Sequence, residues 1–371
     1  MIDPPQIIHT KPQLTAAFIA QRMHSLRLLD GARSASVLDT VAWMGALQAQ
    51  DYESGLWAIG ARAEGLTRVD VEQAIARREI VRTWPMRGTW HFIPAVDARW
   101  MQDLLAARLL PAIQKRSADF GFDETVVSRC RNLVIKTLLA EKSMPREELV
   151  KHIGRAGFSI EAQAGNHLLR RFGNEGLLCN GLMAGKEPTF VLRDEWVRQP
   201  VKLDSDAALA ELALRYFRSH GPATLHDFVW WTGLTVRDAR TAIAAAAQAV
   251  TRRIINDCEH WFSGDDDAPA LSAVELLPAF DEHLLGYQDR RAVLDDERAE
   301  SVCPGGNGVF RPTLVVKGRV AGLWKRKEAA KKMTVEVTPY APLSQSIRRN
   351  LEKAAQRLGE FYSKPVTVAF A

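Results

Sequence analysis

One local pattern, in which helices are followed by a hairpin, recurs along the chain and restricts its fold more than any other feature. In the first copy, apolar residues recur at helical spacing over 37–47 and 56–63, and Thr67 begins a third helix as a capping residue. The β-branched and aromatic runs 80–84 and 89–93 then flank a Pro-Met-Arg-Gly turn. Three helices followed by a hairpin is the order of a winged helix-turn-helix.

The same order returns twice. In the second copy, a helix after Pro145 ends in a turn at 154–157, and a second helix precedes two short strands at 177–179 and 190–192. In the third copy, helical patterns start at Ala208, Leu225 and Val236, and Ile254, Trp261 and Phe262 supply the hairpin. Each copy spans roughly 60 residues, which predicts an internal array of similar units.

The remainder of the chain, from about Leu276, is rich in β patterns. The stretch 315–324 is typical of two strands joined by a glycine turn, and 333–338 alternates as another strand. A helix over 343–361 and a terminal strand over 365–370 follow. The expected fold class is therefore α+β, with about three tandem winged-helix modules and a C-terminal β-rich domain. Their expected boundaries are 1–100, 101–200, 201–275 and 276–371.

Several classes of function are excluded by what the sequence lacks. No apolar run approaches the ~20 residues of a membrane span, and the N-terminus has no pattern of a secretion signal. The four cysteines form no C-x-x-C pair and the nine histidines show no metal-ligand spacing, so neither a metal nor a disulfide is expected. No phosphate-binding loop is present, so no nucleotide cofactor is expected. We expect a cytoplasmic protein, associated with the nucleoid.

Positive charge is concentrated in one short segment. Between Arg311 and Lys332 there are eight basic residues and one acid, a difference of +7, while the whole chain carries only +5. Such a segment is the electrostatic footprint of a polyanion partner, and a solvated surface with no partner is the alternative. Within it we expect Arg311, Lys325 and Arg326 to contact a nucleic-acid backbone. A hairpin with basic residues at its tip fits a nucleic-acid groove.

Motifs spread over most of the chain carry a family resemblance. They are Leu47-Gln48-Ala49-Gln50, Met86-Arg87-Gly88-Thr89-Trp90-His91, Trp230-Trp231-Thr232-Gly233-Leu234, the stretch 277–287 (Leu-Pro-Ala-Phe-Asp-Glu-His-Leu-Leu-Gly-Tyr) and Phe310-Arg311-Pro312-Thr313. Together they resemble the bacterial winged-helix DNA-binding family that contains the AlkZ-type interstrand-crosslink glycosylases. The resemblance implies tandem winged helices and a β-rich domain around a DNA channel. It also implies excision of alkylated purines, notably N7-alkylguanine, through a Gln-x-Gln or Gln-x-Asp pair.

Gln48 and Gln50 match the Gln-x-Gln form of that pair. On a helix, residues two apart point about 200° away from each other, so the two amides converge only if the helix ends before them. The apolar periodicity stops at Leu47 and Asp51 is a favourable cap for a following helix, so an extended Gln-Ala-Gln segment is expected. The alternative is a pair of helix-end glutamines that hydrogen-bond a loop.

Four other residues are weaker candidates for nucleic-acid contact. Arg87 lies at the tip of the first predicted hairpin and either binds phosphate or is a solvated turn residue. His91 is expected to bind or, alternatively, to fill the core. His283 either reaches the channel or bonds Asp281, and Trp324 either wedges against bases or packs the β core. Asp281 and Glu282 resemble half of a metal site without a matching ligand set.

Two classes of function compete. The leading hypothesis is a monofunctional DNA glycosylase that hydrolyses the N-glycosidic bond of N7-alkylated purines in double-stranded DNA, and its extended form includes the unhooking of interstrand crosslinks. The alternative is a non-enzymatic winged-helix regulator or architectural protein, or a family member that has lost activity. A lyase reaction needs an amine nucleophile, and no lysine lies near the glutamine pair in the sequence. A channel formed by modules of one chain predicts a monomer.

Overall fold

Hydrophobic side chains form two cores in the computed structural model, which describes residues 16–155, 162–264, 271 and 274–371. The larger core runs from Phe18 to Phe361 and takes side chains from both ends of the chain. The smaller core lies within the stretch from Trp84 to Leu192. One core seldom serves a chain longer than about 250–300 residues, so two are expected here.

The first part of the chain forms a small helical unit with one sheet. Its elements are α1 (Ala16–Ser25), α2 (Val37–Met44), β1 (Leu47–Gln48), α3 (Tyr52–Gly60), α4 (Arg68–Ala76), β2 (Ile80–Met86) and β3 (Thr89–Pro94). The strands pair in the order β1-β3-β2. Thr67 and Asp70 form the capping box that starts α4, as the sequence predicted. The predicted hairpin is confirmed, and β1, which overlaps the segment predicted to be extended, pairs with β3 as a third strand.

The second part repeats this order after two long helices. Its elements are η1 (Ala95–Asp97), α5 (Ala98–Asp119), α6 (Glu124–Glu141), β4 (Met144–Pro145), α7 (Arg146–Arg155), α8 (Ala162–Asn174), β5 (Leu178–Ala184), β6 (Glu187–Leu192) and α9 (Arg193–Trp196). The strands pair as β4-β6-β5. The predicted two helices and hairpin are present, and the turn predicted at 154–157 lies partly outside the described residues. Nothing in the sequence pattern predicted α5 or α6.

The third part has the same order with a shorter first strand. Its elements are α10 (Ser205–His220), α11 (Leu225–Thr232), α12 (Val236–Ala245), β7 (Thr251–Ile255) and β8 (Cys258–Phe262). A single bridge between Ala223 and Trp261 takes the place of the first strand. In all three parts the chain therefore runs helix, strand or bridge, helix, helix, strand, strand. The predicted hairpin at Ile254 and Trp261–Phe262 is confirmed.

The C-terminal part is built on a five-stranded sheet in the order β13-β12-β11-β10-β9. Its elements are β9 (Val274–Leu277), α13 (Glu282–Leu285), α14 (Asp296–Val302), η2 (Pro304–Gly306), β10 (Thr313–Val316), β11 (Arg319–Glu328), β12 (Met333–Pro339), α15 (Gln345–Phe361) and β13 (Val366–Phe370). The turn between β10 and β11 is Lys317–Gly318, both at positive φ (49° and 73°), which glycine adopts without strain. The predicted strands, glycine turn and C-terminal helix are confirmed.

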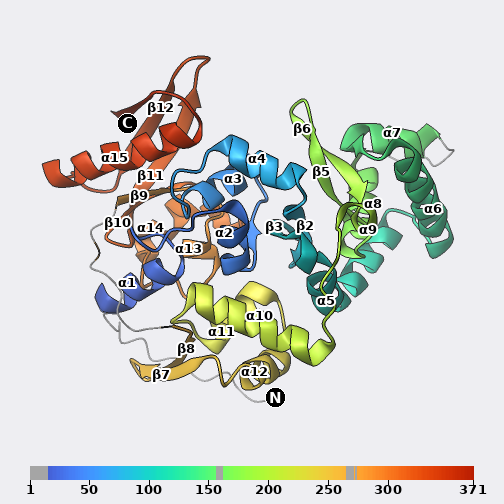
Figure 1. Cartoon of the computed structure of the whole chain (residues 1–371), viewed down its shortest axis with the longest axis horizontal. Coiled ribbons are helices and arrows are strands. Elements are labelled where there is room, and N and C mark those ends of the chain that lie inside the picture. Colours follow the sequence, from blue (N-terminus) through green and yellow to red (C-terminus); the bar gives the residue numbers. More distant parts are fainter. Residues whose placement is uncertain (1–15, 156–161, 265–270, 272–273) are drawn as a thin grey trace.

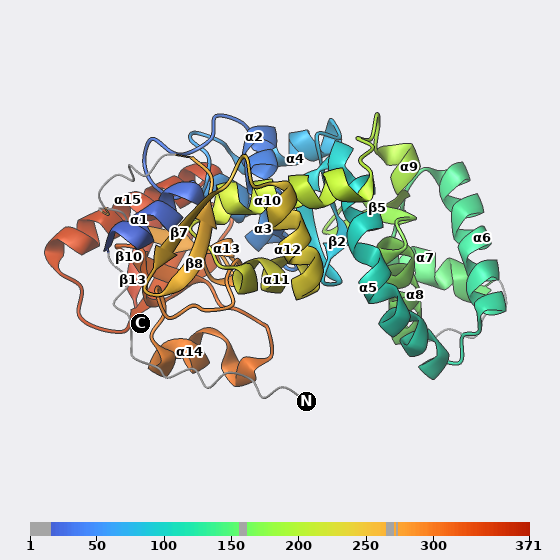
Figure 2. The same ribbon diagram turned by 90° about the horizontal axis from the view of Figure 1, so that it is seen from below.

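The arrangement of these parts leaves two hairpins projecting on one side of the molecule. In Figure 1 the β11–β12 and β5–β6 hairpins rise on either side of α3 and α4. In both views α6 lies at one end of the molecule and α15 at the other (Figures 1 and 2). Within the residues that the structure describes, no helix is long and apolar enough to span a bilayer.

Buried polar contacts fasten the C-terminal part to the first part. Both side-chain oxygens of Asp281 accept hydrogen bonds from Arg62, each at 2.8 Å, and both residues are buried. Trp57 donates to the Leu276 carbonyl at 2.7 Å. A charge in the protein interior is tolerated only when it is paired, so the Arg62–Asp281 contact constrains how the two parts dock.

Replacing Asp281 by Asn leaves the guanidinium of Arg62 buried without its carboxylate. We expect the free energy of unfolding to fall by about 3–5 kcal/mol, the range for loss of one partner of a buried pair. Urea denaturation followed by circular dichroism measures this change. In the control Asp295→Asn, which breaks an exposed pair with Arg319, the loss should stay below about 1 kcal/mol. Equal losses in both variants would contradict the assignment.

Candidate active site

The extended segment predicted at Gln48–Gln50 is present in part, since strand β1 covers Leu47 and Gln48 and Gln50 lies in a bend after it. Helix α2 ends at Met44, with Gly45 at positive φ (74°) as its C-cap. Helix α3 begins at Tyr52, and Asp51 caps it by accepting a hydrogen bond from the Ser54 backbone at 2.7 Å. Side chains of extended backbone alternate between two sides. Leu47 and Ala49 are fully buried on one side, Gln48 is 7% exposed, and Gln50 is exposed.

Backbone contacts from three directions hold this segment. The Ala49 N–H donates to the Trp90 carbonyl at 2.7 Å, which continues the pairing of β1 with β3. Arg82 of β2 donates to the carbonyls of Ala49 at 3.0 Å and Gln50 at 3.4 Å. From the outer edge of β1, the Gln48 N–H donates to Glu282 Oε1 at 3.1 Å.

Each of the two side-chain amides accepts one hydrogen bond from a described residue. Gln48 Oε1 accepts from Arg87 Nη2 at 3.3 Å, and Gln50 Oε1 accepts from the Trp90 N–H at 3.3 Å. An amide oxygen has two acceptor positions, so each glutamine can still accept a hydrogen bond from water. An acceptor that carries partial negative charge can orient water and stabilise nearby positive charge.

Arg87 occupies the tight β2–β3 turn at positive φ (53°) and is partly buried. Burial lowers the pKa of its guanidinium. Its Nε has no hydrogen-bond partner among the described residues. The exposed Arg170 lies against the same turn, because a Cβ added at Gly88 would meet its Nη2 at 2.6 Å. The turn therefore holds one cation, Arg87, at Gln48 and has a second, Arg170, packed against it.

His91 lies directly opposite Gln48 in the sheet and is completely buried. Its Nδ1 lies 2.9 Å from the Thr89 carbonyl and donates to it, so the neutral ring keeps Nε2 as an acceptor with no described partner. Burial, reinforced by the charge of Arg87, lowers the pKa of His91 to about 4. His91 is thus a neutral core residue beside the glutamine pair.

Glu282, which accepts the hydrogen bond from the Gln48 N–H, is 1% exposed. Its Oε2 accepts from Trp231 Nε1 at 3.0 Å and lies 3.5 Å from His220 Nε2. Burial favours a raised pKa, but the interaction with His220 and the nearby charge of Arg87 outweigh it, so the pKa of Glu282 falls to about 2. Glu282 is therefore an ionised carboxylate inside the protein.

The predicted basic segment lies mainly on β11 and the turn after it. Lys325 is exposed and pairs with Glu336 at 3.0 Å, and Arg311 is exposed. Arg326 stacks on the Tyr362 ring at 4.0 Å and lies 3.5 Å from Glu53 in the first turn of α3. Since α3 begins just after Gln50, Arg326 connects the basic hairpin to the neighbourhood of the glutamine pair.

Like His91, two further residues expected to contact nucleic acid are buried instead. His283 is 2% exposed, and its Nε2 donates to the carbonyl of Gly318 in the β10–β11 turn at 3.0 Å. The alternative bond to Asp281 is made by the His283 backbone N–H, at 2.9 Å, and not by the side chain. Trp324 is 7% exposed and donates to the Leu277 carbonyl at 2.8 Å, so it takes the core-packing alternative.

The sequence pattern did not indicate three residues of this neighbourhood, Arg82, Arg170 and Asn180. It indicated Glu282 only as half of a metal site. Arg82 is buried and donates to Asn180 Oδ1 at 2.7 Å, which connects the first unit to β5. An arginine within an otherwise apolar strand was the available signal for Arg82. Among the residues that the structure describes, no three histidine, cysteine or acidic side chains cluster as a metal site would require.

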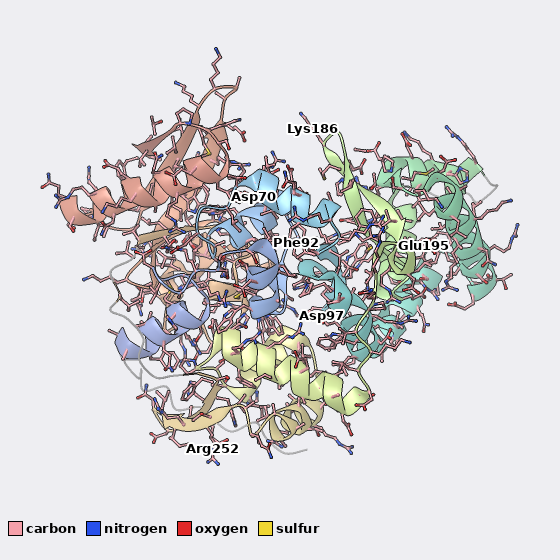
Figure 3. The ribbon with its side chains drawn as sticks, in the orientation of Figure 1. Asp70, Phe92, Asp97, Lys186, Glu195 and Arg252 are labelled. Carbon is pink, nitrogen blue, oxygen red and sulfur yellow. The ribbon has the colours of Figure 1, made fainter. Side chains whose placement is uncertain are left out.

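Figure 3 places this neighbourhood in the molecule. Phe92, which follows His91 on β3, lies near its middle, whereas Lys186 is at the tip of the β5–β6 hairpin and Arg252 lies on β7 at the other side. The segment that carries the glutamines is thus central, between the two projecting hairpins and the third helical unit.

Comparison with known proteins identifies the fold and then the family. The solved structure of Streptomyces sahachiroi DNA glycosylase AlkZ matches with a TM-score of 0.77 at 23% identity, over 95% of this chain and 99% of that one. The curated interstrand DNA cross-link repair glycosylase of the same organism is 24% identical over 358 residues, 89% of this chain and 91% of that protein. The model of the family described as DNA glycosylase AlkZ-like matches residues 41–361. The chain belongs to this AlkZ-like family and is an enzyme of the DNA glycosylase class, as the motif resemblance implied.

The buried histidines predict how stability depends on pH. Burial lowers the pKa of both His91 and His283 to about 4, whereas an unfolded histidine titrates near about 6.5. The folded protein binds fewer protons in this window, so stability present above pH ~6.5 is lost as the pH falls toward ~4. His283→Gln should flatten this loss by up to about 1.4 kcal/mol per pH unit. Urea denaturation between pH 7 and 5 measures the slope, and a slope equal to the wild-type value would refute this prediction.

Proposed function

We propose that this enzyme excises N7-alkylated purines from double-stranded DNA, with Gln48 and Gln50 as its catalytic residues. The observation that carries the proposal is the burial along 47–50, where Leu47 and Ala49 are fully buried while Gln48 is 7% exposed and Gln50 is exposed. The exposure of Gln50 supports access from solvent. Membership of the AlkZ-like family supports the reaction class.

The chemistry of the leaving base explains why uncharged amides suffice. A purine alkylated at N7 already carries positive charge and leaves without protonation by an acid. The enzyme needs to orient a water molecule and stabilise a sugar that becomes an oxocarbenium ion. Amide oxygens of Gln48 and Gln50 perform both tasks by accepting from water and placing partial negative charge near the sugar. A normal, uncharged base would leave slowly from such a site, which gives selectivity.

We further propose that the three repeated units act as winged helices around a DNA channel. Their shared order of elements supports this reading, with boundaries near 1–100, 101–200 and 201–275 and a β-rich domain from 276. The β11–β12 and β5–β6 hairpins stand on either side of α3 and α4 (Figure 1). Gln50 lies two residues before the start of α3, so a duplex bound between the hairpins would reach it. Arg311, Lys325, Arg326 and Arg87 then neutralise phosphates. One chain forms the whole channel, so the enzyme acts as a monomer in the cytoplasm.

The substrate range is proposed to include crosslinked bases. The Streptomyces relative is named for repair of interstrand DNA cross-links. A crosslinked N7-alkylguanine carries the same positive charge as a simple adduct and differs only in its tether to the other strand. We propose that the chain unhooks such crosslinks through the same displacement at the sugar.

Alanine substitutions test the two glutamines. In the variant Gln48→Ala/Gln50→Ala, excision of N7-methylguanine from a duplex should fall at least about 100-fold, because the groups that orient water are absent. Affinity for the same duplex should change less than about twofold, since neither amide carries charge. Hot-alkali cleavage of the abasic product measures excision, and fluorescence anisotropy measures affinity.

The exposed Gln248, after α12, offers a matched control. Gln248→Ala should excise at the wild-type rate. Wild-type excision by the double variant would reject Gln48 and Gln50 as catalytic residues. Binding without cleavage by the wild-type protein would favour a non-enzymatic DNA-binding role.

The basic hairpin predicts a salt dependence of DNA binding. Each phosphate contact contributes about one unit to the slope of log affinity against log salt. Lys325→Ala and Arg311→Ala should therefore each lower this slope by about one unit, measured by anisotropy between 50 and 200 mM salt. Lys136→Ala, on the exposed surface of α6 at the far end of the molecule, should leave the slope unchanged. A wild-type curve that is flat in this range would refute the phosphate contacts.

A further inference from the structure

The ionised carboxylate of Glu282 contacts the backbone of the strand that carries Gln48. β1 is an edge strand, and the N–H of Gln48 on its free edge donates to Glu282 Oε1 at 3.1 Å. The other oxygen of Glu282 is fixed by the indole N–H of Trp231 on α11 at 3.0 Å. The carboxylate is thus held between two structural units and cannot turn away from β1 without breaking a buried hydrogen bond.

The charges around the segment explain why this carboxylate matters. Arg82 and Arg87 both lie against the segment, and they donate hydrogen bonds there to carbonyl and amide oxygens rather than to carboxylates. Burial lowers the pKa of Arg82 to about 10, so it stays charged at neutral pH. Without Glu282, the buried Arg82 and the partly buried Arg87 would be the charges nearest to a sugar bound at the glutamines, which becomes positively charged. Such an arrangement would oppose the transition state.

We propose that Glu282 is a positioning residue of the active site, which orients Gln48 and supplies the fixed negative charge that favours a cationic sugar. This inference rests on the proposed excision of N7-alkylated purines. Glu282 acts through the Gln48 backbone and through its field, and it does not touch the reacting atoms. Glu282 thus supplies a full negative charge that the glutamines cannot supply, because neither of their amides carries a full charge.

The reaction balances with this assignment. The bond between C1′ of the sugar and N9 of the purine breaks, and its electron pair leaves with the base and neutralises the alkylpurinium. The positive charge passes to the sugar, where the field of Glu282 stabilises it. Water adds to C1′ and gives its proton to solvent. Glu282 remains ionised throughout, so it neither donates nor accepts a proton.

A charged substrate mimic tests the fixed charge without relying on turnover. Duplexes that contain either a cationic pyrrolidine or a neutral tetrahydrofuran abasic analogue differ only in the charge at the sugar. The wild-type protein should prefer the pyrrolidine duplex, because it resembles the transition state. Glu282→Gln should bind the tetrahydrofuran duplex within about twofold of wild type and lose at least about tenfold of the preference. Excision by this variant should fall about 100-fold in single-turnover assays.

Two further variants separate this role from a structural one. Glu275 is also buried (3% exposed) and paired, with Arg33 at 2.8 Å and Arg357 at 3.1 Å, but it lies on β9. Glu275→Gln should keep the wild-type preference for the cationic analogue even if it lowers the melting temperature. Glu282→Asp keeps the charge but withdraws it from Gln48, so it should retain most of the preference while excision slows.

The outcomes distinguish this inference from the function on which it rests. A wild-type protein that neither excises N7-methylguanine nor prefers the pyrrolidine duplex overturns the proposed function. A wild-type protein that does both, together with a Glu282→Gln variant of unchanged preference, overturns the role of Glu282 alone. If Glu282→Gln does not fold, wild-type excision by Glu282→Asp overturns the positioning role.

Discussion

Two consecutive acidic residues, Asp281 and Glu282, are the constraint on which the rest of the site depends. Asp281 receives both guanidinium hydrogen bonds of the buried Arg62, and Glu282 receives the backbone N–H of Gln48. Both carboxylates are buried, and a buried charge is stable only while its partners stay in place. The chain near residue 281 is therefore locked to the first unit, and the two-residue strand β1 acquires on its free edge a partner that the sheet itself does not supply.

The opposite side of the segment is fixed by a buried cation. Arg82 binds the carbonyls of Ala49 and Gln50 and donates to Asn180 in the second unit. With Glu282 on the other edge, the first unit, the second unit and the C-terminal part all meet at the glutamine pair. Neutral amides exert weak forces, and they contribute to catalysis only when their geometry is set before the substrate arrives. The ion pairs and hydrogen bonds around this segment supply that rigidity, while the glutamines themselves remain uncharged.

Local structure near the site was predictable because it depends on near neighbours. The Thr67 capping box, the Asp51 cap and the extended backbone at Leu47–Gln48 all follow from a few adjacent residues. The long helices α5 and α6 were missed. Pro111 interrupts the pattern of α5, whereas α6 carries a usable apolar stripe of Val127, Cys130, Val134 and Leu138. The strand β9 was missed because it is only four residues long and pairs with a strand far along the chain.

The sequence by itself determined the order of helices and hairpins, the family motifs and the choice of glutamines, because these follow from residue type and short-range spacing. Only the tertiary structure decided which charges surround them. Arg82 and Glu282 are 200 residues apart in the chain, and their meeting at Gln48–Gln50 depends on how separate units pack. The sequence left Glu282 as half of a metal site and left His283 and Trp324 as open alternatives. Burial resolved these questions, because a polar side chain removed from water takes whichever partner the folded chain brings to it.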